Sequence, residues 1–412
     1  MKIGEFAEKH GVSKATVRYY IQMGLLNPHS PGSQLVFTSK DDWDISRILK
    51  FKNMRLNLDQ IRELLFQERT SNFIETGTLD ECIAILRNKQ SELKQEEQEI
   101  KDSIKAVQTE IEALEARKVR VPKVRSGVSF RAAAILACPI CGKNLKMEEA
   151  VIENQFILQA KLRCSSGYQG RIENGIVLTG LTYQGGHDWP DLQRKIYHET
   201  GREYSIASVK CTDFILQHLK RLDLQQKVIL ESNINGFFFM YKFLGQLSHD
   251  CLYVFVDKYP EVLMEYKKYL ESLYDDLDAL YIADAEGNYP LKEHSIDIWA
   301  GMFDEDEFSF YHPACQLHFI KKYLSPAVKI IGSHHSLPWN SQTRKNYFVK
   351  YPESEKNLFN MQAMQKDYEA EGFVLIPQLM GTAYQTLKHH SFECHVDGEP
   401  IELYGYTAVR KK

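Results

Sequence analysis

The chain has 412 residues, of which 43% are hydrophobic and 11% aromatic, enough to fill the cores of several domains. This composition excludes a chain that is disordered throughout. The formal net charge is −4, but residues 1–70 hold 11 Lys and Arg against 8 Asp and Glu, whereas the remainder holds 40 against 47. A basic face for nucleic acid therefore belongs to the N-terminal segment. Because no apolar stretch approaches the length of about eighteen residues that a membrane helix needs, and no signal peptide begins at Met1, we expect a cytoplasmic protein without a membrane partner.

The predicted elements begin with closely spaced short helices. An apolar stripe over residues 3–7 is interrupted at His10-Gly11, and Ser13 is a suitable N-cap for a second helix. The inner face of that helix would carry Val17, Tyr20 and Ile21. This spacing is typical of a helix-turn-helix.

A wing-like hairpin is predicted next. Residues 27–33 have the composition of a turn, and residues 34–38 alternate like a short strand. Two capping signals then mark the starts of two further helices: Ser39 with Asp42, and Asn57 with Gln60. We therefore expect residues 1–70 to form a winged helix-turn-helix domain.

Residues 71–120 predict one long helix with a regular apolar seam. Nine of eleven seam positions are apolar: Leu79, Ile83, Leu86, Gln90, Leu93, Glu97, Ile100, Ile104, Val107, Ile111 and Leu114. A helix over residues 79–118 would be about 60 Å long and mostly polar around its circumference. We expect it to pair as a coiled coil that makes a homodimer. The alternative is an amphipathic helix that lies on its own domain.

Three cysteines in residues 121–185 suggest a metal site. Cys138 and Cys141 form a Cys-x-x-Cys-Gly knuckle, and Cys164 follows after a strand-like stretch. A closed zinc site needs four ligands, yet residues 165–168 supply no second Cys or His, so His187 is the remaining candidate. The segment is thus either a zinc-ribbon-like β unit or a ribbon that has lost its metal.

Residues 186–412 alternate strand and helix signals, as a doubly wound α/β domain does. Several predicted strands are short and apolar, which is typical of strands buried on both faces. The strands are predicted at residues 227–231, 251–257, 279–282, 296–299, 328–332 and 373–378, with helices at 260–273 and 312–324. A last strand, at 401–409, is predicted to be antiparallel and to lie at the sheet edge.

We predict no metal-binding or catalytic role for two polar clusters in this part of the chain. No acid or cysteine falls at ligand spacing around His334 and His335, so these histidines are interpreted as structural or surface residues. The same interpretation covers His389, His390 and His395. The acidic run at residues 304–307 predicts a solvated loop near the top of the sheet.

The N-terminal motifs resemble the MerR family of transcription regulators. The residues that carry this resemblance are Ile3-Gly4-Glu5-Phe6-Ala7, Gly11-Val12-Ser13, Val17-Arg18-Tyr19-Tyr20, Gly24-Leu25-Leu26 and the run from Leu58 to Leu65. The resemblance implies a dimer that binds a palindromic promoter site on double-stranded DNA. It also implies that the DNA is bent and untwisted, and that an unknown small-molecule effector changes this distortion. In the wing, Gln34-Leu35-Val36 stands where the family has Gly-Tyr-Arg, so one phosphate contact is missing.

Candidate DNA-binding residues lie on the second helix, which would enter the major groove. They are Lys14, Thr16, Arg18, Tyr19 and Tyr20. Arg18 and Tyr19 are expected to contact phosphate or a base edge, whereas Tyr20 can equally be part of the core.

Residues 134–409 resemble a zinc-ribbon-headed class I S-adenosylmethionine-dependent methyltransferase, similar to the family that methylates guanine in large-subunit ribosomal RNA. The cysteines and Glu173-Asn174-Gly175-Ile176-Val177 carry the head, and Val228 to Gly236, Val256-Asp257, Ala283-Asp284-Ala285 and His294 to Trp299 carry the body. The resemblance implies that the cofactor is held by Glu231, Asn233, Gly236, Asp257 and Asp284, with Asp257 on the ribose and Asp284 on the adenine.

The first loop departs from this family. Asn233, Asn235 and Phe237 stand at the three glycine positions, where the backbone must approach the cofactor closely. We therefore expect weak or no binding of S-adenosylmethionine and a regulator whose methyltransferase-like part senses a ligand. The alternative is an active methyltransferase, on nucleic acid or a small molecule, that carries a DNA-binding domain.

Overall fold

The computed structural model describes residues 1–30, 34–71, 76–118, 127–186, 189–192, 201–357, 359–384 and 394–411. The chain divides into two compact units, Met1–Val119 and Arg120–Lys412. Within the described ranges, no helix is both long enough and apolar enough to cross a membrane.

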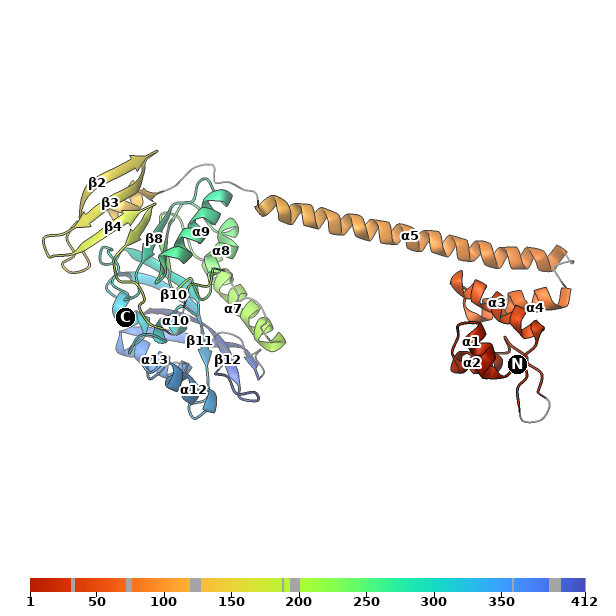
Figure 1. The fold of residues 1–412 in the computed structure, drawn as a ribbon. Helices are drawn as coiled ribbons and strands as arrows, with labels where there is room; N and C mark the ends of the chain where they lie inside the picture. The colour runs from red at the N-terminus through yellow and green to blue at the C-terminus, as the bar shows by residue number, and fades with distance from the viewer. Residues whose placement is uncertain are drawn as a thin grey trace. The chain divides into compact units, whose positions relative to one another are not determined.

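The first unit is helical around a small core (Figure 1). Its helices are α1 (Ile3–Lys9), α2 (Lys14–Gln22), α3 (Ser39–Asn53), α4 (Leu58–Ser71) and α5 (Thr76–Lys118). As expected, Ser13 caps α2: its hydroxyl accepts a 3.0 Å hydrogen bond from the Thr16 amide. The predicted reciprocal pair of Asn57 and Gln60 is also confirmed, at 2.9 and 2.8 Å.

The start of α3 corrects the sequence prediction by one residue. The capping pair is Thr38 with Asp41, whose carboxylate accepts the Thr38 amide at 2.8 Å, rather than Ser39 with Asp42. Asp42 instead accepts hydrogen bonds from Lys9, the last residue of α1, and from His10, which follows it. In the wing, the described residues make a single antiparallel bridge between His29 and Val36.

Helix α5 has 43 residues, and its two ends differ in burial. Near its start, Cys82 is buried and Ile85 packs against the core formed by the other helices. Farther along, the side chains of Ile100, Ile104 and Val107 are 58%, 64% and 60% exposed. The apolar seam therefore forms one face of α5. In its distal half, this face is not covered by the described residues of this chain.

The second unit is built on one 12-stranded sheet. Its strands are β1 (Val128–Ser129), β2 (Lys146–Glu153), β3 (Phe156–Arg163), β4 (Gln169–Glu173), β5 (Ile176–Leu178), β6 (Val228–Glu231), β7 (Leu252–Asp257), β8 (Ala279–Ala283), β9 (Ile296–Met302), β10 (Leu324–Ser336), β11 (Phe373–Ala383) and β12 (Ile401–Arg410). They follow the order β1-β3-β4-β5-β8-β7-β6-β9-β10-β12-β11, and β2 pairs with β3. The run from β5 to β10 is parallel, and the remaining pairings are antiparallel.

Helices cover both faces of the central strands, as the doubly wound prediction requires (Figure 1). The helices of this unit are α6 (Phe130–Ala134), α7 (Arg202–Lys220), α8 (Phe239–Phe243), α9 (Pro260–Leu273), α10 (Asp304–Ser309), α11 (Gln316–Ile320), α12 (Gln342–Lys350) and α13 (Met361–Ala370). Strand β7 shows the two faces: Tyr253 and Phe255 pack with α7 and α9, whereas Leu252, Val254 and Val256 pack with α11 and α13. Alternate side chains of a fully buried strand thus serve two cores.

Three details of this unit differ from the sequence predictions. Strand β12 is antiparallel but lies between β10 and β11, so β11 forms the edge. The helix predicted at 312–324 is limited to α11. The segments 121–185 and 186–412 were expected as separate domains, but β5 pairs in parallel with β8, and the small strands continue the large sheet.

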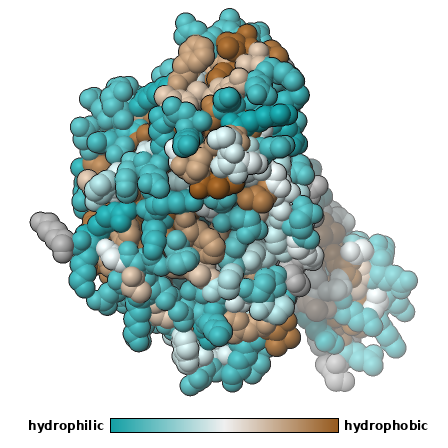
Figure 2. Space-filling view, turned by 90° about the vertical axis from the view of Figure 1, so that its left-hand side faces the viewer, coloured by the Kyte–Doolittle hydropathy of each residue, from teal (hydrophilic) through white to brown (hydrophobic). Residues whose placement is uncertain are grey.

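The strands β1 to β4, with β2 outermost, form the head of the sheet. Seven of the eight residues of β2 are exposed. Figure 2 shows hydrophobic residues at the top of one face, over this head, where Val151 and Ile152 are among the exposed apolar residues.

Candidate functional site

The predicted DNA-binding residues divide into an exposed set and one core residue. Lys14, Arg18 and Tyr19 are exposed on α2, and Thr16 is half-buried. Tyr20 is only 6% exposed and belongs to the core of the first unit. The outer face of α2 therefore presents two cations and one aromatic ring, and Tyr20 is not part of it.

Glu231, at the end of β6, is turned into the protein. Its two carboxylate oxygens accept the backbone amides of Phe239 and Met240, at 2.6 and 2.9 Å, and its side chain is fully buried. Burial raises the pKa of this carboxyl well above its usual range. Glu231 thus caps the first turn of α8.

The loop after β6 is held by hydrogen bonds within the chain. Asn233 adopts a left-handed backbone conformation with φ of 53°, which Asn tolerates better than most residues. Its side-chain amide donates to the backbone oxygen of Asp304 at 2.9 Å. At Gly236, an added Cβ would lie 3.4 Å from a carboxylate oxygen of Glu307, which is an ordinary contact distance, so the space here does not require a glycine.

Asp257, at the end of β7, is also engaged by its own chain. Its carboxylate accepts the amide of Asn235 at 2.6 Å and the amide of Tyr259 at 2.8 Å. Burial raises its pKa to about 7, although the charge of Lys258 and these amides act in the opposite direction. The side chain of Asn235 in turn contacts the backbone of Trp189 and Asp191, and holds that segment beside the loop.

Asp284, at the end of β8, follows the same pattern. The Thr179 hydroxyl donates to one carboxylate oxygen at 2.8 Å, and the amides of Glu286 and Asn288 donate to the other at 3.0 Å. Burial raises its pKa to about 6. The three acids predicted to hold a cofactor are therefore all at the strand ends, and all accept hydrogen bonds from neighbouring residues of this chain.

Lys258 occupies the space between these strand ends. It is 5% exposed, and its ammonium donates to Glu307 at 2.6 Å. Three tyrosine rings surround the ammonium: Tyr311 at 4.0 Å, Tyr183 at 5.4 Å and Tyr259 at 5.6 Å from their centroids. Such distances are within the range of cation–π attraction.

The residues at this edge do not fit S-adenosylmethionine. The cavity beside Lys258 has a volume of about 30 Å³, which is too small for a molecule of the size of S-adenosylmethionine. S-adenosylmethionine also carries a positively charged sulfonium group. The ammonium of Lys258 already lies near the tyrosine rings, so a second cation would be repelled there. Together with the hydrogen bonds that the carboxylates already accept, these features disfavour binding of the cofactor among the residues that the structure describes at this edge.

The prediction of a solvated loop at residues 304–307 is wrong. These residues belong to α10, in which Asp304, Glu305 and Asp306 are buried rather than solvated. Asp304 accepts the Ser232 amide at 3.0 Å, and Glu305 accepts the amide of Gln316 at 2.7 Å. Burial raises the pKa of both Asp304 and Glu305 to about 7.

Asp306 and the histidine pair form a buried network that the sequence analysis missed. His335 donates its backbone amide at 2.9 Å to Asp306, and its Nδ1 lies 2.8 Å from the same carboxylate oxygen. Its Nε2 lies 2.8 Å from the Tyr204 hydroxyl. His334 pairs with the other carboxylate oxygen. Burial alone would raise the pKa of Asp306, but the two histidines outweigh it and lower this pKa to about 2.

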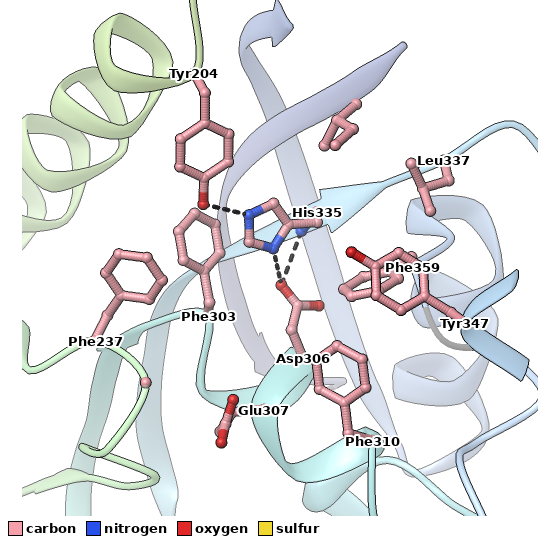
Figure 3. A pocket seen from close by; sticks show the side chains of 12 residues that line it. Tyr204, Phe237, Phe303, Asp306, Glu307, Phe310, His335, Leu337, Tyr347 and Phe359 are labelled. Atoms are coloured by element: carbon pink, nitrogen blue, oxygen red, sulfur yellow. Dashed lines mark hydrogen bonds and ion pairs between the residues drawn. The ribbon is translucent and has the colours of Figure 1, made fainter. Parts of the chain in front are cut away.

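Figure 3 shows that this network lines an aromatic pocket. The pocket lies beyond the ends of β6, β9 and β10 and has a volume of about 40 Å³. Its aromatic walls are Tyr204, Phe237, Phe303, Phe310, Tyr347 and Phe359. Phe303 has a φ of 63°, an uncommon conformation for a bulky residue, and its ring stacks on His335 with centroids 3.8 Å apart.

The three predicted metal ligands converge in the head. The sulfur atoms of Cys138, Cys141 and Cys164 all lie within 4.8 Å of one another. The Cys138 sulfur lies 3.0 Å from the Ser166 hydroxyl, and hydrogen bonds from Ser166 are the main cause that lowers the pKa of Cys164 to about 6. In the described ranges, no fourth His, Cys or carboxylate joins them, and His187 lies outside those ranges.

The remaining histidine predictions have separate outcomes. His334 and His335 are buried, not surface residues, and they have the acidic partner that the sequence spacing did not reveal. His395 is buried and its Nε2 lies 2.9 Å from the backbone oxygen of Glu399. His389 and His390 lie outside the described residues.

Comparisons with known proteins match the two units to different classes. Residues 1–68 match the family described as MerR HTH family regulatory protein. A transcription regulator from Ralstonia metallidurans, solved in complex with lead(II), is 30% identical, with 25% of this chain and 83% of that chain covered and a TM-score of 0.20. No curated protein sequence matches the chain.

Other similar structures are methyltransferases. A SAM-dependent methyltransferase from Thiobacillus denitrificans in complex with S-adenosyl-L-homocysteine is 11% identical, with 54% of this chain and 100% of that chain covered and a TM-score of 0.39. Phosphoethanolamine N-methyltransferase 2 from Haemonchus contortus, in complex with S-adenosyl-L-methionine, is 14% identical, with 55% of this chain covered and a TM-score of 0.36. This chain spans 61% of the length of that enzyme.

Proposed function

We propose that the chain is a homodimeric transcription regulator whose methyltransferase-like part senses a ligand and does not transfer methyl groups, and the match of residues 1–68 to the MerR family of helix-turn-helix regulators supports this. The DNA contacts would come from Lys14, Arg18 and Tyr19 on the exposed face of α2. Two copies of this face, joined through α5, would bind the two halves of a palindromic promoter site.

One observation carries the non-catalytic part of this proposal: the edge that would hold the cofactor is filled by the chain itself. Asp257 and Asp284 each accept hydrogen bonds on both carboxylate oxygens, and the Lys258 ammonium lies between the tyrosines of the crevice. Binding of S-adenosylmethionine would have to displace a buried ion pair and several hydrogen bonds, at a large cost in free energy.

Titration calorimetry of the full chain with S-adenosylmethionine and S-adenosylhomocysteine tests this proposal. We expect no heat of binding in folded protein that still binds its promoter DNA. A dissociation constant in the low micromolar range that Asp257→Ala abolishes would instead establish the alternative, an active methyltransferase. The retained acids at the ends of β6, β7 and β8 favour that alternative.

The head would hold one zinc ion through Cys138, Cys141 and Cys164, with water or His187 as the fourth ligand. The convergence of three sulfur atoms supports this assignment. When bound, the ion would cross-link the knuckle after α6 to the strand end at Cys164, so its role is structural.

A further inference from the structure

We propose that the aromatic pocket beyond β6, β9 and β10 binds a quaternary ammonium head group, a cation without N–H donors. The inference rests on the proposed sensor function and names the chemical class of its effector. The pocket is next to the filled crevice, and Glu307 lines both cavities.

Its position in the fold is the first argument. In the sheet order, β6 is followed by β7 and β8 on one side and by β9 and β10 on the other. Doubly wound sheets bind ligands outside the carboxyl ends of the strands at such a switch point. Phe237 follows β6, Phe303 follows β9 and His335 lies near the end of β10, so the pocket occupies this point.

The walls are the second argument, because they are aromatic and already packed against one another. Phe237 meets Phe303 edge to face, with centroids 5.1 Å apart and planes at 71°. Phe359 meets Phe310 at 5.2 Å and 80°, and Tyr347 at 5.0 Å and 67°. A cluster of rings held in this way attracts a cation through the negative faces of the π systems.

Charge is the third argument. The described lining contains two carboxylates, those of Asp306 and Glu307, one histidine, and no Lys or Arg. Both acids are paired within the chain, Glu307 with Lys258 and Asp306 with His334 and His335, so an anion gains nothing from the lining. The preference for a cation over a neutral molecule of the same shape comes from the faces of the aromatic rings.

The hydrogen bonds of these acids select the type of cation. Asp306 already accepts two bonds from His335, and Glu307 accepts one from Lys258. A primary ammonium would bring three N–H donors into an aromatic site and leave them short of acceptors. A quaternary ammonium has no donors to satisfy, and the volume of about 40 Å³ suits a head group rather than a larger molecule.

Phe237 links this pocket to the altered loop. It stands where the methyltransferase resemblance expects a glycine, and it supplies one wall of the pocket. The substitution that obstructs the usual cofactor thus completes a different site.

Titration calorimetry of the full chain with choline and with 3,3-dimethyl-1-butanol tests the assignment, because the second compound has the same shape with carbon in place of nitrogen. We expect choline to bind and the neutral compound to bind at least about tenfold more weakly. Phe237→Leu and Phe359→Leu should each weaken choline binding about three- to tenfold. Phe319→Leu, the same substitution at a half-buried position outside this lining, should leave it unchanged.

Equal affinity for the two compounds would overturn the assignment, as would ethanolamine binding as tightly as choline. Absence of choline binding in folded protein would overturn it as well. Gel-shift assays with promoter DNA separate this inference from the proposed function. Choline binding that leaves the DNA affinity unchanged would establish the pocket and refute the sensor role, whereas a shift in DNA affinity with choline would support both.

Discussion

The backbone amide of Asn235 donates a 2.6 Å hydrogen bond to the carboxylate of Asp257. In the methyltransferase resemblance that the sequence suggests, Asn235 is predicted to stand at a glycine position and Asp257 at the position of the ribose-binding acid. The bond ties the altered loop to the end of β7, and the side chain of Asn235 extends the connection to Trp189 and Asp191. The loop and the acid are therefore connected to each other within the chain, which supports the proposal that the retained acids do not hold a cofactor.

Substitution of apolar residues in the seam of α5 should convert the dimer into monomers. We expect Ile100→Asp with Ile104→Asp to give monomers by light scattering, because two carboxylates would face the partner helix in an apolar interface. DNA binding should fall together with dimerisation. The control is Gln95→Asp with Thr109→Asp, two acids on the opposite face of the same helix. A seam variant that stays dimeric would show that the partner surface lies elsewhere.

Removal of Arg18 should weaken DNA binding. If Arg18 reads a base edge, Arg18→Ala should cost about 1–3 kcal/mol and relax specificity, and if it contacts phosphate, the loss should be uniform across sequences with a shallower salt dependence. Fluorescence anisotropy with promoter DNA at several salt concentrations distinguishes the two. Arg87→Ala on α5 removes an equal charge as a control. Unchanged affinity of a folded Arg18→Ala protein would remove this residue from the interface.

Loss of Lys258 should destabilise the second unit. Lys258→Met would leave Glu307 without the ammonium that it now contacts, and breaking one side of a buried pair costs about 3–5 kcal/mol. Denaturant unfolding measures the change. The double variant Lys258→Met with Glu307→Gln should lose less than the single variant, because no uncompensated charge remains. Equal losses in both would indicate that the ion pair contributes little.

Buried acids should make the second unit less stable at alkaline pH. Asp257, Asp304 and Glu305 have folded-state pKa values raised by burial to about 7, so they bind protons more tightly when folded than when unfolded. Their contribution is complete below the unfolded pKa of about 4 and is lost as the pH rises through about 7. We therefore expect a lower Tm at pH 8 than at pH 5.5. Asp304→Asn should flatten this dependence, and the exposed Asp213→Asn should not.

The zinc content of the purified protein tests the metal site proposed in the head of the sheet. We expect about one zinc per chain by elemental analysis of protein prepared without chelator. Cys138→Ser or Cys164→Ser should remove it, whereas Cys394→Ala, at a buried cysteine outside the cluster, should retain it. Zinc-free wild-type protein would favour a ribbon that is stable through packing alone.

Local signals predicted much of the second unit's framework. Pro260 and an amphipathic pattern set the bounds of α9, which the structure confirms, and the apolar run at residues 252–256 gave a strand buried on both faces. In the first unit, Ser13 and the pair of Asn57 and Gln60 act within three residues, so their roles can be predicted from sequence.

The buried acids could not be predicted in this way, because their partners are distant in sequence. One carboxylate oxygen of Asp304 accepts a hydrogen bond from Ser232, 72 residues away, and one of Asp306 accepts a hydrogen bond from His335, 29 residues away. Four consecutive acids without these partners have the composition of a solvated loop. A usable signal was their position a few residues after the strand predicted at 296–299, which placed them near the carboxyl edge of the sheet.

The place of β12 in the sheet sets the order in which the sheet can be completed. Strand β11 pairs with β12 and is joined to β10 only through it, yet β12 comes later in the chain. During synthesis on the ribosome, β11 leaves the exit tunnel before the strand that will connect it to the rest of the sheet. Until then, β10 has an open edge that a chaperone, or another nascent chain, can reach. Insertion of β12 is therefore the step that closes this edge and ends that exposure.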